Sequence, residues 1–395
     1  MARLGDICTI YTGTGFPNQY QGETSGDYPF YKVGDISKNV TKGNKYLQEC
    51  DNYVSADIVK KIKGTIVPID TVVFAKIGEA VKLNKRAITS KNCLVDNNAM
   101  GVCPDQKRLN LSYFFHYMCN IQLETYAEAT TVPSVKKSII ENLDIPLPTY
   151  EEQTKKSLIL DKVCDLISLR KQQLSKLDEL VKSRFIEMFG DPMENPMGWD
   201  RVNISAVVGG KVSNGFFAKR DDYCDDGNVK VLGVAHVVNR MYSNVEDLPI
   251  TNGTEADVAK YGVKYGDMLF CRSSLVAAGI GKASIVPKDT PNNVLFECHV
   301  IRLPLALNKC VPEFMQVLST TDYFRNQVIA QSKTATMTTI GQDGILKTDI
   351  ILPPLELQKQ FLKFVEQTDK SKFEIQKSLE KLETLKKALM QKYFG

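Results

Sequence analysis

Three segments of the sequence gather basic and amide side chains around bends that contain glycine or asparagine. They are KIGEAVKLNKR at 76–86, SNGFFAKR at 213–220 and CRSSLVAAGIGK at 271–282. Lysine and arginine bind phosphates, whereas arginine, lysine and asparagine can also hydrogen-bond to the edges of bases. These residue types support contact with a polyanion, and the alternative for each one taken alone is an ordinary solvated surface charge.

The candidate contact residues all come from these three segments. Lys76 and Arg272 rank first, because each ends a strand-like segment, TVVFAK at 71–76 and DMLFCR at 267–272. The two segments occupy matching places in the two halves of the chain. The full set is Lys76, Lys82, Lys85, Arg86, Asn214, Lys219, Arg220, Arg272, Ser273, Ser274 and Lys282.

Residue patterns for catalysis or metal binding are missing from the sequence. It has no GxxxxGK[ST] loop for phosphates, no GxGxxG, no HExxH and no GxSxG. Its 3 histidines are scattered, and its 10 cysteines form no CxxC pair, which argues against zinc-ribbon spacing and for buried reduced thiols. We therefore predict that the chain is not an enzyme and that it binds no cofactor or metal itself.

The composition is that of an ordinary globular protein. The chain has 395 residues, of which 43% are hydrophobic and 24% are charged, and a formal net charge of +4. This length predicts two or three domains, and the mild excess of positive charge permits a polyanionic partner without requiring one. The sequence contains no apolar run of the roughly 18 residues that a membrane span needs and no signal peptide, so we expect a cytoplasmic location.

The end of the chain repeats its middle. Residues 349–395 align without a gap with residues 144–190 at an offset of 205 residues, and both copies contain the same proline, glutamine and final Phe-Gly. This period is far longer than the roughly 20–50 residues of a solenoid unit. It indicates two tandem copies of a domain followed by a helix, an arrangement suited to gripping two similar targets at a fixed separation.

A heptad pattern marks two long helices, which we expect at about 151–189 and 356–394. In the first helix an apolar residue recurs every seven positions, which favours a coiled coil, and two such helices in one chain can pair with each other. An ordinary helical hairpin or a dimerisation coil is the alternative. The predicted pairing residues are Leu160, Ile167, Leu174, Leu177, Val181, Val365, Ile375, Leu379, Leu382 and Leu389.

Mixed α/β domains are predicted ahead of the two helices. Strands are expected at PFYKVGDI (29–36) and VKVLGVAHV (229–237), and short helices at 111–118 and 312–319. The segments TTVPSVKKSII and TMTTIGQDGIL then lead into the proline-containing turns before the long helices. The order of these elements matches in the two copies, although their sequences differ.

Several of these features together resemble the specificity (S) subunit of type I restriction–modification systems. They are the PTYEEQ and PPLELQ strings before the helices, the junction MFGDPMENPMGW at 188–199, the LGDI opening at 4–7 and the two lead-in segments. The resemblance covers essentially the whole chain. Thr149 and Tyr150 replace the usual second proline and leucine, and Leu357 replaces the usual glutamate before Gln358.

The resemblance implies an α+β chain, with two α/β target-recognition domains in tandem repeat, separated by two long antiparallel coiled-coil helices. The implied recognition domains are 1–143 and 200–348, and the implied helical regions are 144–199 and 349–395. It also implies a non-catalytic subunit that recognises a split target in double-stranded DNA, and the candidate contact residues chosen above by residue type would be the contacts. A coiled-coil interaction scaffold without sequence-specific DNA binding is the alternative.

Partners and cofactors follow from the same resemblance. The helices would dock two DNA-methyltransferase (M) subunits, which bind S-adenosylmethionine and methylate adenine. Restriction (R) subunits, which use ATP and Mg, would complete a system for defence against foreign DNA. This chain itself would bind no cofactor, and no membrane would take part.

Overall fold

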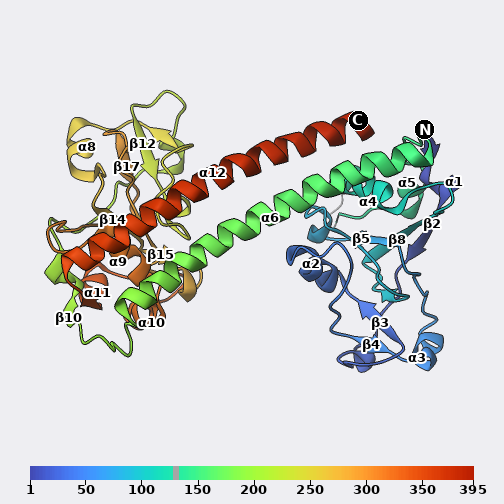
Figure 1. Ribbon diagram of the computed structural model, residues 1–395, viewed down its shortest axis with the longest axis horizontal. Helices are drawn as coiled ribbons and strands as arrows, with labels where there is room; N and C mark the ends of the chain where they lie inside the picture. Colours follow the sequence, from blue (N-terminus) through green and yellow to red (C-terminus); the bar gives the residue numbers. More distant parts are fainter. Residues whose placement is uncertain (128–132) are drawn as a thin grey trace. The chain divides into compact units, whose positions relative to one another are not determined.

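The computed structural model describes residues 1–127 and 133–395. The chain forms two compact units, each of which combines one α/β domain with one half of each long helix (Figure 1). Unit 1 comprises Met1–Gln173 and Ile375–Gly395, and unit 2 comprises Leu174–Glu374. The four-segment division expected from the sequence cuts the chain at other points and stays a proposal. Residues 130–132, which begin the first lead-in segment, lie outside the described residues.

The domain of unit 1 contains two small sheets and a strand pair. Its main sheet is antiparallel with the strand order β2-β8-β5-β6, and its second sheet has the order β4-β3-β7, in which β3 and β7 are parallel. The strands are β1 (Ala2–Arg3), β2 (Cys8–Thr12), β3 (Tyr28–Tyr31), β4 (Tyr53–Val54), β5 (Val72–Ala75), β6 (Arg86–Ile88), β7 (Leu94–Val95), β8 (Ala99–Pro104) and β9 (Asp144–Ile145). The helices are α1 (Leu4–Ile7), α2 (Val33–Thr41), α3 (Ala56–Lys61), α4 (Leu111–Asn120) and α5 (Lys137–Glu141). β1 pairs with β9 just before the long helix begins.

The domain of unit 2 is built from the same kinds of sheet. The strands are β10 (Asp200–Asn203), β11 (Ser213–Asn214), β12 (Val229–Leu232), β13 (Ile250–Thr251), β14 (Asp267–Cys271), β15 (Ser273–Ser274), β16 (Ala283–Ile285), β17 (Val294–Phe296), β18 (Val300–Pro304), β19 (Lys333–Thr334), β20 (Thr338–Thr339) and β21 (Asp349–Leu352). The helices are α7 (Val234–Val237), α8 (Glu255–Tyr261), α9 (Pro312–Ser319), α10 (Asp322–Ala330) and α11 (Gln342–Leu346).

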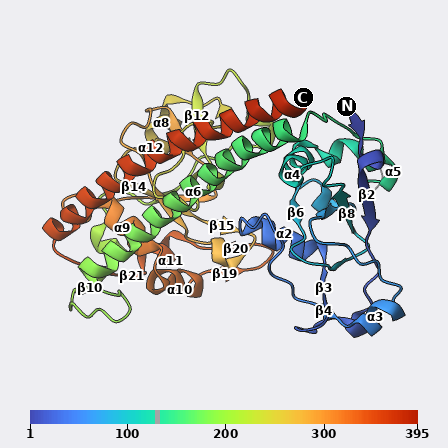
Figure 2. The ribbon, with the colours of Figure 1, turned by 45° about the vertical axis from the view of Figure 1, so that its right-hand side comes forward.

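The two domains share one topology. The orders β2-β8-β5-β6 and β4-β3-β7 of unit 1 correspond to β11-β18-β14-β16 and β13-β12-β17 of unit 2, and the pair β1-β9 corresponds to β10-β21. The single parallel pairing also recurs, between β12 and β17. The prediction of two α/β domains in tandem is therefore confirmed. In unit 2 a further sheet with the order β15-β20-β19 lies beyond β14 (Figure 2).

The two strands predicted at PFYKVGDI and VKVLGVAHV are shorter than expected. β3 and β12 each end after four residues, and the helices α2 and α7 begin within the same segments. A distant carboxylate accepts a hydrogen bond from the first helical N–H in both domains. Val33 N donates to Asp96 Oδ2 at 3.3 Å, and Val234 N donates to Glu297 Oε1 at 2.8 Å. Such a bond caps a helix start, and a partner so far along the chain leaves no sign in the local pattern.

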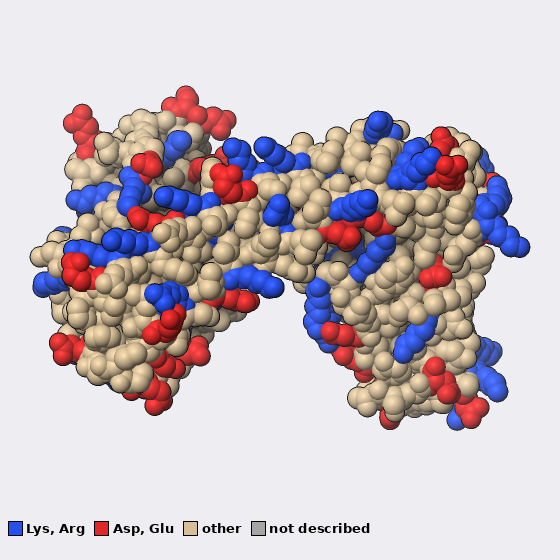
Figure 3. Space-filling model, viewed as in Figure 1, with Lys and Arg blue, Asp and Glu red and all other residues tan. Residues whose placement is uncertain are grey.

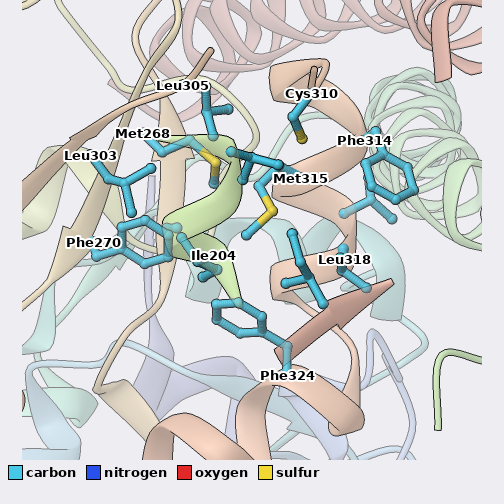
Figure 4. Close-up of a cluster of buried hydrophobic side chains, with 14 of the residues drawn as sticks. Ile204, Met268, Phe270, Leu303, Leu305, Cys310, Phe314, Met315, Leu318 and Phe324 are labelled. Atoms are coloured by element: carbon cyan, nitrogen blue, oxygen red, sulfur yellow. The ribbon is translucent and has the colours of Figure 1, made fainter. Parts of the chain in front are cut away.

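A buried core joins the main sheet of unit 2 to its helices (Figure 4). Met268 and Phe270 of β14 lie in one cluster with Phe314 and Met315 of α9 and with Phe324 of α10. Every residue of β14 is buried. This explains why MLFC at 268–271 is a continuous apolar run rather than an alternating pattern, as is typical of a strand covered on both faces.

The long helices take part in this core. α6 (Tyr150–Phe189) contributes Phe185 and Phe189 to the cluster, and α12 (Leu355–Phe394) contributes Phe361 and Val365. The ring of Phe185 packs at 5.7 Å from that of Phe361, and the ring of Phe189 packs at 4.9 Å from that of Phe314. Half of each helix is therefore an integral part of the fold of unit 2.

The two helices run antiparallel within each unit (Figures 1 and 2). Lys171 forms an ion pair with Glu383 at 3.0 Å in unit 1, and Lys372 forms one with Asp178 at 2.7 Å in unit 2. Each helix contains 40 residues, which gives a length of about 60 Å at 1.5 Å per residue. Ion pairs at a surface contribute little to stability, so the pairing depends on the apolar seam.

The predicted pairing residues are all at least half-buried. The buried ones are Leu160, Ile167, Val181, Val365 and Leu379, and the half-buried ones are Leu174, Leu177, Ile375, Leu382 and Leu389. In α6 the seam is thus covered most fully toward the two ends of the helix and less fully at Leu174 and Leu177 in the middle. The assignment of individual residues to helix pairing or to partner docking stays a proposal.

A carboxylate on α6 fastens that helix to the domain of unit 1. Asp161 accepts hydrogen bonds from Lys45 Nζ at 2.8 Å and from Ser112 Oγ at 2.6 Å, and it lies 2.9 Å from His116 Nε2. Burial raises the pKa of Asp161, but the bonds to His116, Lys45 and Ser112 outweigh burial and hold the pKa well below its usual range. Glu366, which lies 205 positions further on, likewise binds a lysine of its own domain at 3.0 Å.

A buried glutamine connects each domain to its long helix. Gln153 accepts a hydrogen bond from Asn110 N at 2.8 Å and donates to Arg108 O and Pro148 O, both at 3.0 Å. Gln358 makes the same three bonds in unit 2, to Val311 N at 2.9 Å, Lys309 O at 3.3 Å and Pro353 O at 2.8 Å. The glutamine shared by the two sequence repeats therefore holds the start of the long helix against the turn that begins α4 or α9.

Replacement of either glutamine by alanine is expected to destabilise its unit by about 3 kcal/mol, because it leaves one buried N–H and two carbonyls without partners. Gln153→Glu should cost at least as much as Gln153→Ala, because the buried carboxylate keeps the bond from Asn110 N but faces the carbonyl oxygens of Arg108 and Pro148 without a proton to donate. Urea denaturation measures the effect, with Gln172→Ala at an exposed site of α6 as the matched control. Equal stability of Gln153→Ala and Gln172→Ala would contradict the structural role of the junction.

Candidate DNA interface

Lys76 and Arg272 occupy equivalent positions, each directly after an inner strand of a main sheet, β5 or β14. Lys76 N donates to Asn98 O at 2.8 Å, and Arg272 N donates to His299 O at 2.8 Å. The carbonyl of each residue accepts a hydrogen bond from the lead-in segment, at 2.8 Å for Lys76 and at 3.0 Å for Arg272. Both side chains are half-buried, and Arg272 also donates to Cys298 O at 3.1 Å. The match expected between these two strand ends therefore extends to their main-chain hydrogen bonds.

The other basic side chains of 76–86 differ in how firmly their present ion-pair and hydrogen-bond partners hold them. Lys82 is exposed and pairs with Glu79 at 2.9 Å, and the hydrogen bond to that carboxylate raises the pKa of Lys82. Lys85 donates to Thr41 Oγ1 at 2.8 Å. Lys82 can therefore exchange its partner for a phosphate at the surface, whereas Lys85 is held by the end of α2.

Arg86 does not lie where a direct DNA contact needs it. It is 4% exposed, donates to Asn84 Oδ1 at 2.9 Å and to Lys85 O at 3.0 Å, and lies over the ring of Phe74 at 4.9 Å. Burial lowers the pKa of Arg86 to about 10. Because a buried cation that loses its partners is costly, we withdraw Arg86 as a direct DNA contact and assign it to the packing of β6.

The candidates of unit 2 come from β11 and the loop after it and from the segment after β14, and both strands pair with β18. Lys219 and Arg220 are exposed, and Asn214 on β11 is half-buried with an Oδ1 atom that has no hydrogen-bond partner among the described residues. Ser273 is buried in β15, whereas Ser274 is half-buried and accepts a hydrogen bond from Val276 N at 3.3 Å. The two groups adjoin the same segment, because Asn214 pairs with Ile301 and Arg272 N donates to His299 O.

Lys282 lines a groove of about 680 Å³ in unit 2. Four further cations line this groove, which lies between the half-helices, the α9–α10 segment and the loop after α7, and two carboxylates face them. The cations are Lys182, Arg240, Arg325 and Lys372, and the carboxylates are Asp178 and Asp369. The excess of basic groups suits an anion. Sequence reasoning missed these four cations because they come from four separate segments and no local spacing connects them.

A second groove occupies the equivalent place in unit 1. Its volume is about 500 Å³, and it is lined by Lys171, Lys386, Lys387 and Glu383 together with residues at the end of α4. Glu383 and Lys387 lie 205 positions after Asp178 and Lys182 of the first groove. The duplication thus extends from the topology to the surface beside the helices.

Charge over the visible surface is mixed rather than gathered in one block. In Figure 3 basic and acidic side chains alternate over both α/β domains and along the helices. Selectivity for a polyanion would therefore come from particular loops and grooves rather than from a general positive field. Among residues 1–127 and 133–395, no group of acidic, histidine and cysteine side chains has the arrangement of a metal site. No helix within those ranges is long and apolar enough to span a membrane.

Comparison with protein families gives a match over almost the whole chain. The family model described as the type I restriction modification DNA specificity domain matches residues 1–179 and again residues 196–387. The chain belongs to this family. The two matches coincide with the two topologically equivalent domains and their helices, so the chain has the organisation of a specificity subunit with two target-recognition domains.

Curated relatives are specificity subunits as well. The MjaVIII specificity subunit of Methanocaldococcus jannaschii is 26% identical over 415 residues, which cover 99% of this chain and 90% of that protein. The EcoKI specificity subunit of Escherichia coli K12 is 20% identical over 74% of this chain and 67% of that protein. The resemblance noted in the sequence is thereby confirmed. Specificity subunits are non-catalytic, and so is this chain.

Solved structures show the same fold. The S subunit from M. genitalium superposes with a TM-score of 0.56 at 11% identity, over 100% of this chain and 95% of that one. A chain from a study of complex assembly and conformational transition of the type I restriction–modification system gives a TM-score of 0.54 at 16% identity, over 100% and 96%. Tandem α/β domains with long helices are therefore common to this chain and to solved S subunits.

Proposed function

We propose that this chain recognises a split target in double-stranded DNA, with one half-target read by each α/β domain. One observation carries the proposal: the family match and the sheet topology both occur twice, whereas the loops at equivalent strand ends differ in sequence. A shared framework with different loops suits two readers of different sequences. We place the recognition domains at 1–143 and 200–348, and the helical regions at 144–199 and 349–395.

The proposed contacts divide by chemistry. Exposed Lys82, Lys219 and Arg220 suit phosphates, which fix the register of a protein on DNA without reading its sequence. Lys76 and Arg272 lie at strand ends, where a side chain can reach a base edge. Among the remaining candidates, those that we retain for contact with DNA are Asn214, Ser273, Ser274 and Lys282. Lys85 would have to leave Thr41 to take part, so we rank it last.

We further propose that the helices dock two methyltransferase subunits and that restriction subunits join the assembly in the cytoplasm. S-adenosylmethionine, ATP and Mg would then be bound by those partners. The helices offer suitable surfaces, because α6 carries several exposed apolar side chains on its solvent side. Those in its first half are Leu158, Ile159, Leu166 and Leu169.

Methylome sequencing tests the proposal directly. A host that carries the chain with its methyltransferase partner should show one bipartite methylated sequence, which disappears when only this chain is deleted. A methylome that does not depend on the chain, together with DNA binding that is indifferent to sequence, would favour the alternative of a coiled-coil scaffold.

DNA binding by the assembled complex should weaken steeply with salt, because phosphate contacts release counterions. Arg272→Ala is expected to weaken binding in one of two recognisable ways. If Arg272 contacts a phosphate, affinity falls for all sequences and the slope of log affinity against log salt decreases by about 1. If it reads a base, one position of the target is relaxed by about 1–3 kcal/mol.

Lys76→Ala provides the same test in unit 1. Lys347→Ala removes an equal charge from an exposed site outside the three contact segments and serves as the matched control. Binding and methylation at wild-type levels by both Arg272→Ala and Lys76→Ala would show that these strand ends do not face DNA.

A further inference from the structure

The loop that follows β14 in unit 2 exposes two neighbouring apolar side chains. Leu275 is 83% exposed and Val276 is 63% exposed. Single exposed apolar residues are common on protein surfaces and need no explanation. Here two further features indicate that the exposed pair contacts a ligand: the fixed backbone of its loop and the polar, basic side chains around it.

The backbone of this loop is firmly held. Val276 N donates to Ser274 Oγ at 3.3 Å, Arg325 donates to Ala278 O at 3.1 Å, and Gly281 N donates to Cys271 O at 2.8 Å. Gly281 has a φ of +61°, in the left-handed region that favours glycine. Leu275 and Val276 therefore project from a preorganised loop, which reduces the entropy lost when they bind.

The surroundings of the pair are polar and basic. β15 pairs with β20 and β20 pairs with β19, so that Ser273 lies opposite Thr339, and Thr339 lies opposite the exposed Lys333 (Figure 2). Arg272 directly precedes β15. A protein–protein interface also has an apolar centre and a polar rim, so charge decides between a protein and a polyanion: the neighbouring cations Arg272 and Lys333 match a polyanion.

The major groove of DNA matches this surface better. It admits a β-ribbon, it is flanked by phosphates that bind lysine and arginine, and its floor presents hydrogen-bond acceptors together with the 5-methyl group of thymine. Apolar side chains contact that methyl group. The corresponding loop of unit 1 also exposes a leucine, Leu83, but Leu83 follows the short turn Glu79–Val81, whereas the apolar pair precedes the turn Ala277–Gly279, so the pair is particular to unit 2.

We propose that Leu275 and Val276 contact thymine methyl groups in the half-target read by unit 2, with the β15-β20-β19 sheet facing the major groove. The proposal rests on the proposed function, because it requires this domain to bind DNA. It assigns to the pair a role in specificity that charge and hydrogen bonding alone would not reveal.

The test uses this chain in complex with its methyltransferase partner and a duplex that contains the target found by methylome sequencing. Each thymine of the second half-target is replaced in turn by deoxyuridine, which lacks only the methyl group. The wild-type complex should bind about fourfold less tightly at one or two of these positions, since burial of one methyl-sized group is worth this factor. The double variant Leu275→Ala, Val276→Ala should bind the thymine and deoxyuridine duplexes equally.

The controls separate this proposal from the proposed function. Leu307→Ala removes another exposed leucine of unit 2 and should leave the sensitivity to deoxyuridine unchanged. Both substituted side chains are exposed, so the double variant should unfold at the same urea concentration as the wild type. Lack of any sequence-specific binding by the complex would overturn the proposed function itself.

Several results would overturn only the methyl contact while target recognition survives. The first is a second half-target without an A·T pair. The second is wild-type binding that is indifferent to deoxyuridine at every position, or a double variant that keeps the wild-type sensitivity. The third is a double variant that loses only self-association of the chain, which would show that the apolar pair meets a second copy.

Discussion

A fragment of residues 1–190 is expected to form a two-fold dimer that directs methylation of a palindromic site. In the intact chain, Phe394 of α12 packs against Tyr113 and Tyr117 of unit 1, with ring centroids 5.0 Å and 5.8 Å apart. The fragment lacks Phe394 but contains Phe189 next to its last residue, and Phe189 occupies the equivalent place in the repeat, where it packs against Phe314 of unit 2 in the intact chain. The Phe189 of a second copy can therefore take the place of Phe394.

The association would be isologous, with α6 of each copy covering the domain of the other. Light scattering measures the mass of the fragment, and methylome sequencing with the methyltransferase partner measures its activity. The control is the fragment with Phe189→Asp, which should be monomeric and inactive because the site of Phe394 cannot accept a carboxylate. A monomeric parent fragment that supports no methylation would refute the independence of the two repeats.

Lengthening the long helices is expected to change the spacing of the two half-targets but not their sequences. Four residues inserted near Ser175 of α6 add about 6 Å to that helix, which is close to two base-pair steps of roughly 3.4 Å each. Ser175 lies next to the boundary between unit 1 and unit 2 on α6. The insertion also turns the seam by about 40°, since four residues slightly exceed a 3.6-residue turn. Methylome sequencing should reveal the same half-sequences with a spacer longer by one or two base pairs.

A matched insertion after Glu374 of α12 sharpens this experiment, because α12 passes from unit 2 to unit 1 at that point. With both helices lengthened, each half-helix keeps its own partners, and methylation should be stronger than with the single insertion. Seven residues in each helix preserve the heptad phase and should add about three base pairs. Altered half-sequences with an unchanged spacer would mean that the helices do not set the spacing.

Sequence periodicity located the large features of this fold well. α6 begins at Tyr150 and ends at Phe189, and α12 ends at Phe394, each within one residue of the helix limits expected from the heptads and the Phe-Gly ends. Long elements leave many periodic positions, so their pattern is clear. The two-residue strands β15, β19 and β20 contain too few positions for any period and were not expected.

Prediction of the candidate site was less complete, for a physical reason. Arg86 has the residue type of a DNA contact, but in the folded protein its side chain is enclosed by Phe74 and Asn84 and is not accessible to DNA. Conversely, Lys182 and Arg240 stand alone in the sequence and meet only at the groove of unit 2. Exposure and convergence are properties of the tertiary structure, and local spacing does not encode them.

The glutamine junction bears on how chains of this kind can diversify. Within the described part of the chain, the side chains of Gln153 and Gln358 hydrogen-bond to main-chain atoms of the domains and turns that they hold. Because these bonds depend on the position of the main chain, they do not restrict which side chains the domain carries. Substitutions that alter recognition therefore need no compensating change in the helices. A whole domain with the same turn before its α4-type helix could be exchanged between genes by recombination at the helix start. New target sequences would then arise in one step, while the surface that meets the partner subunits stays as it was.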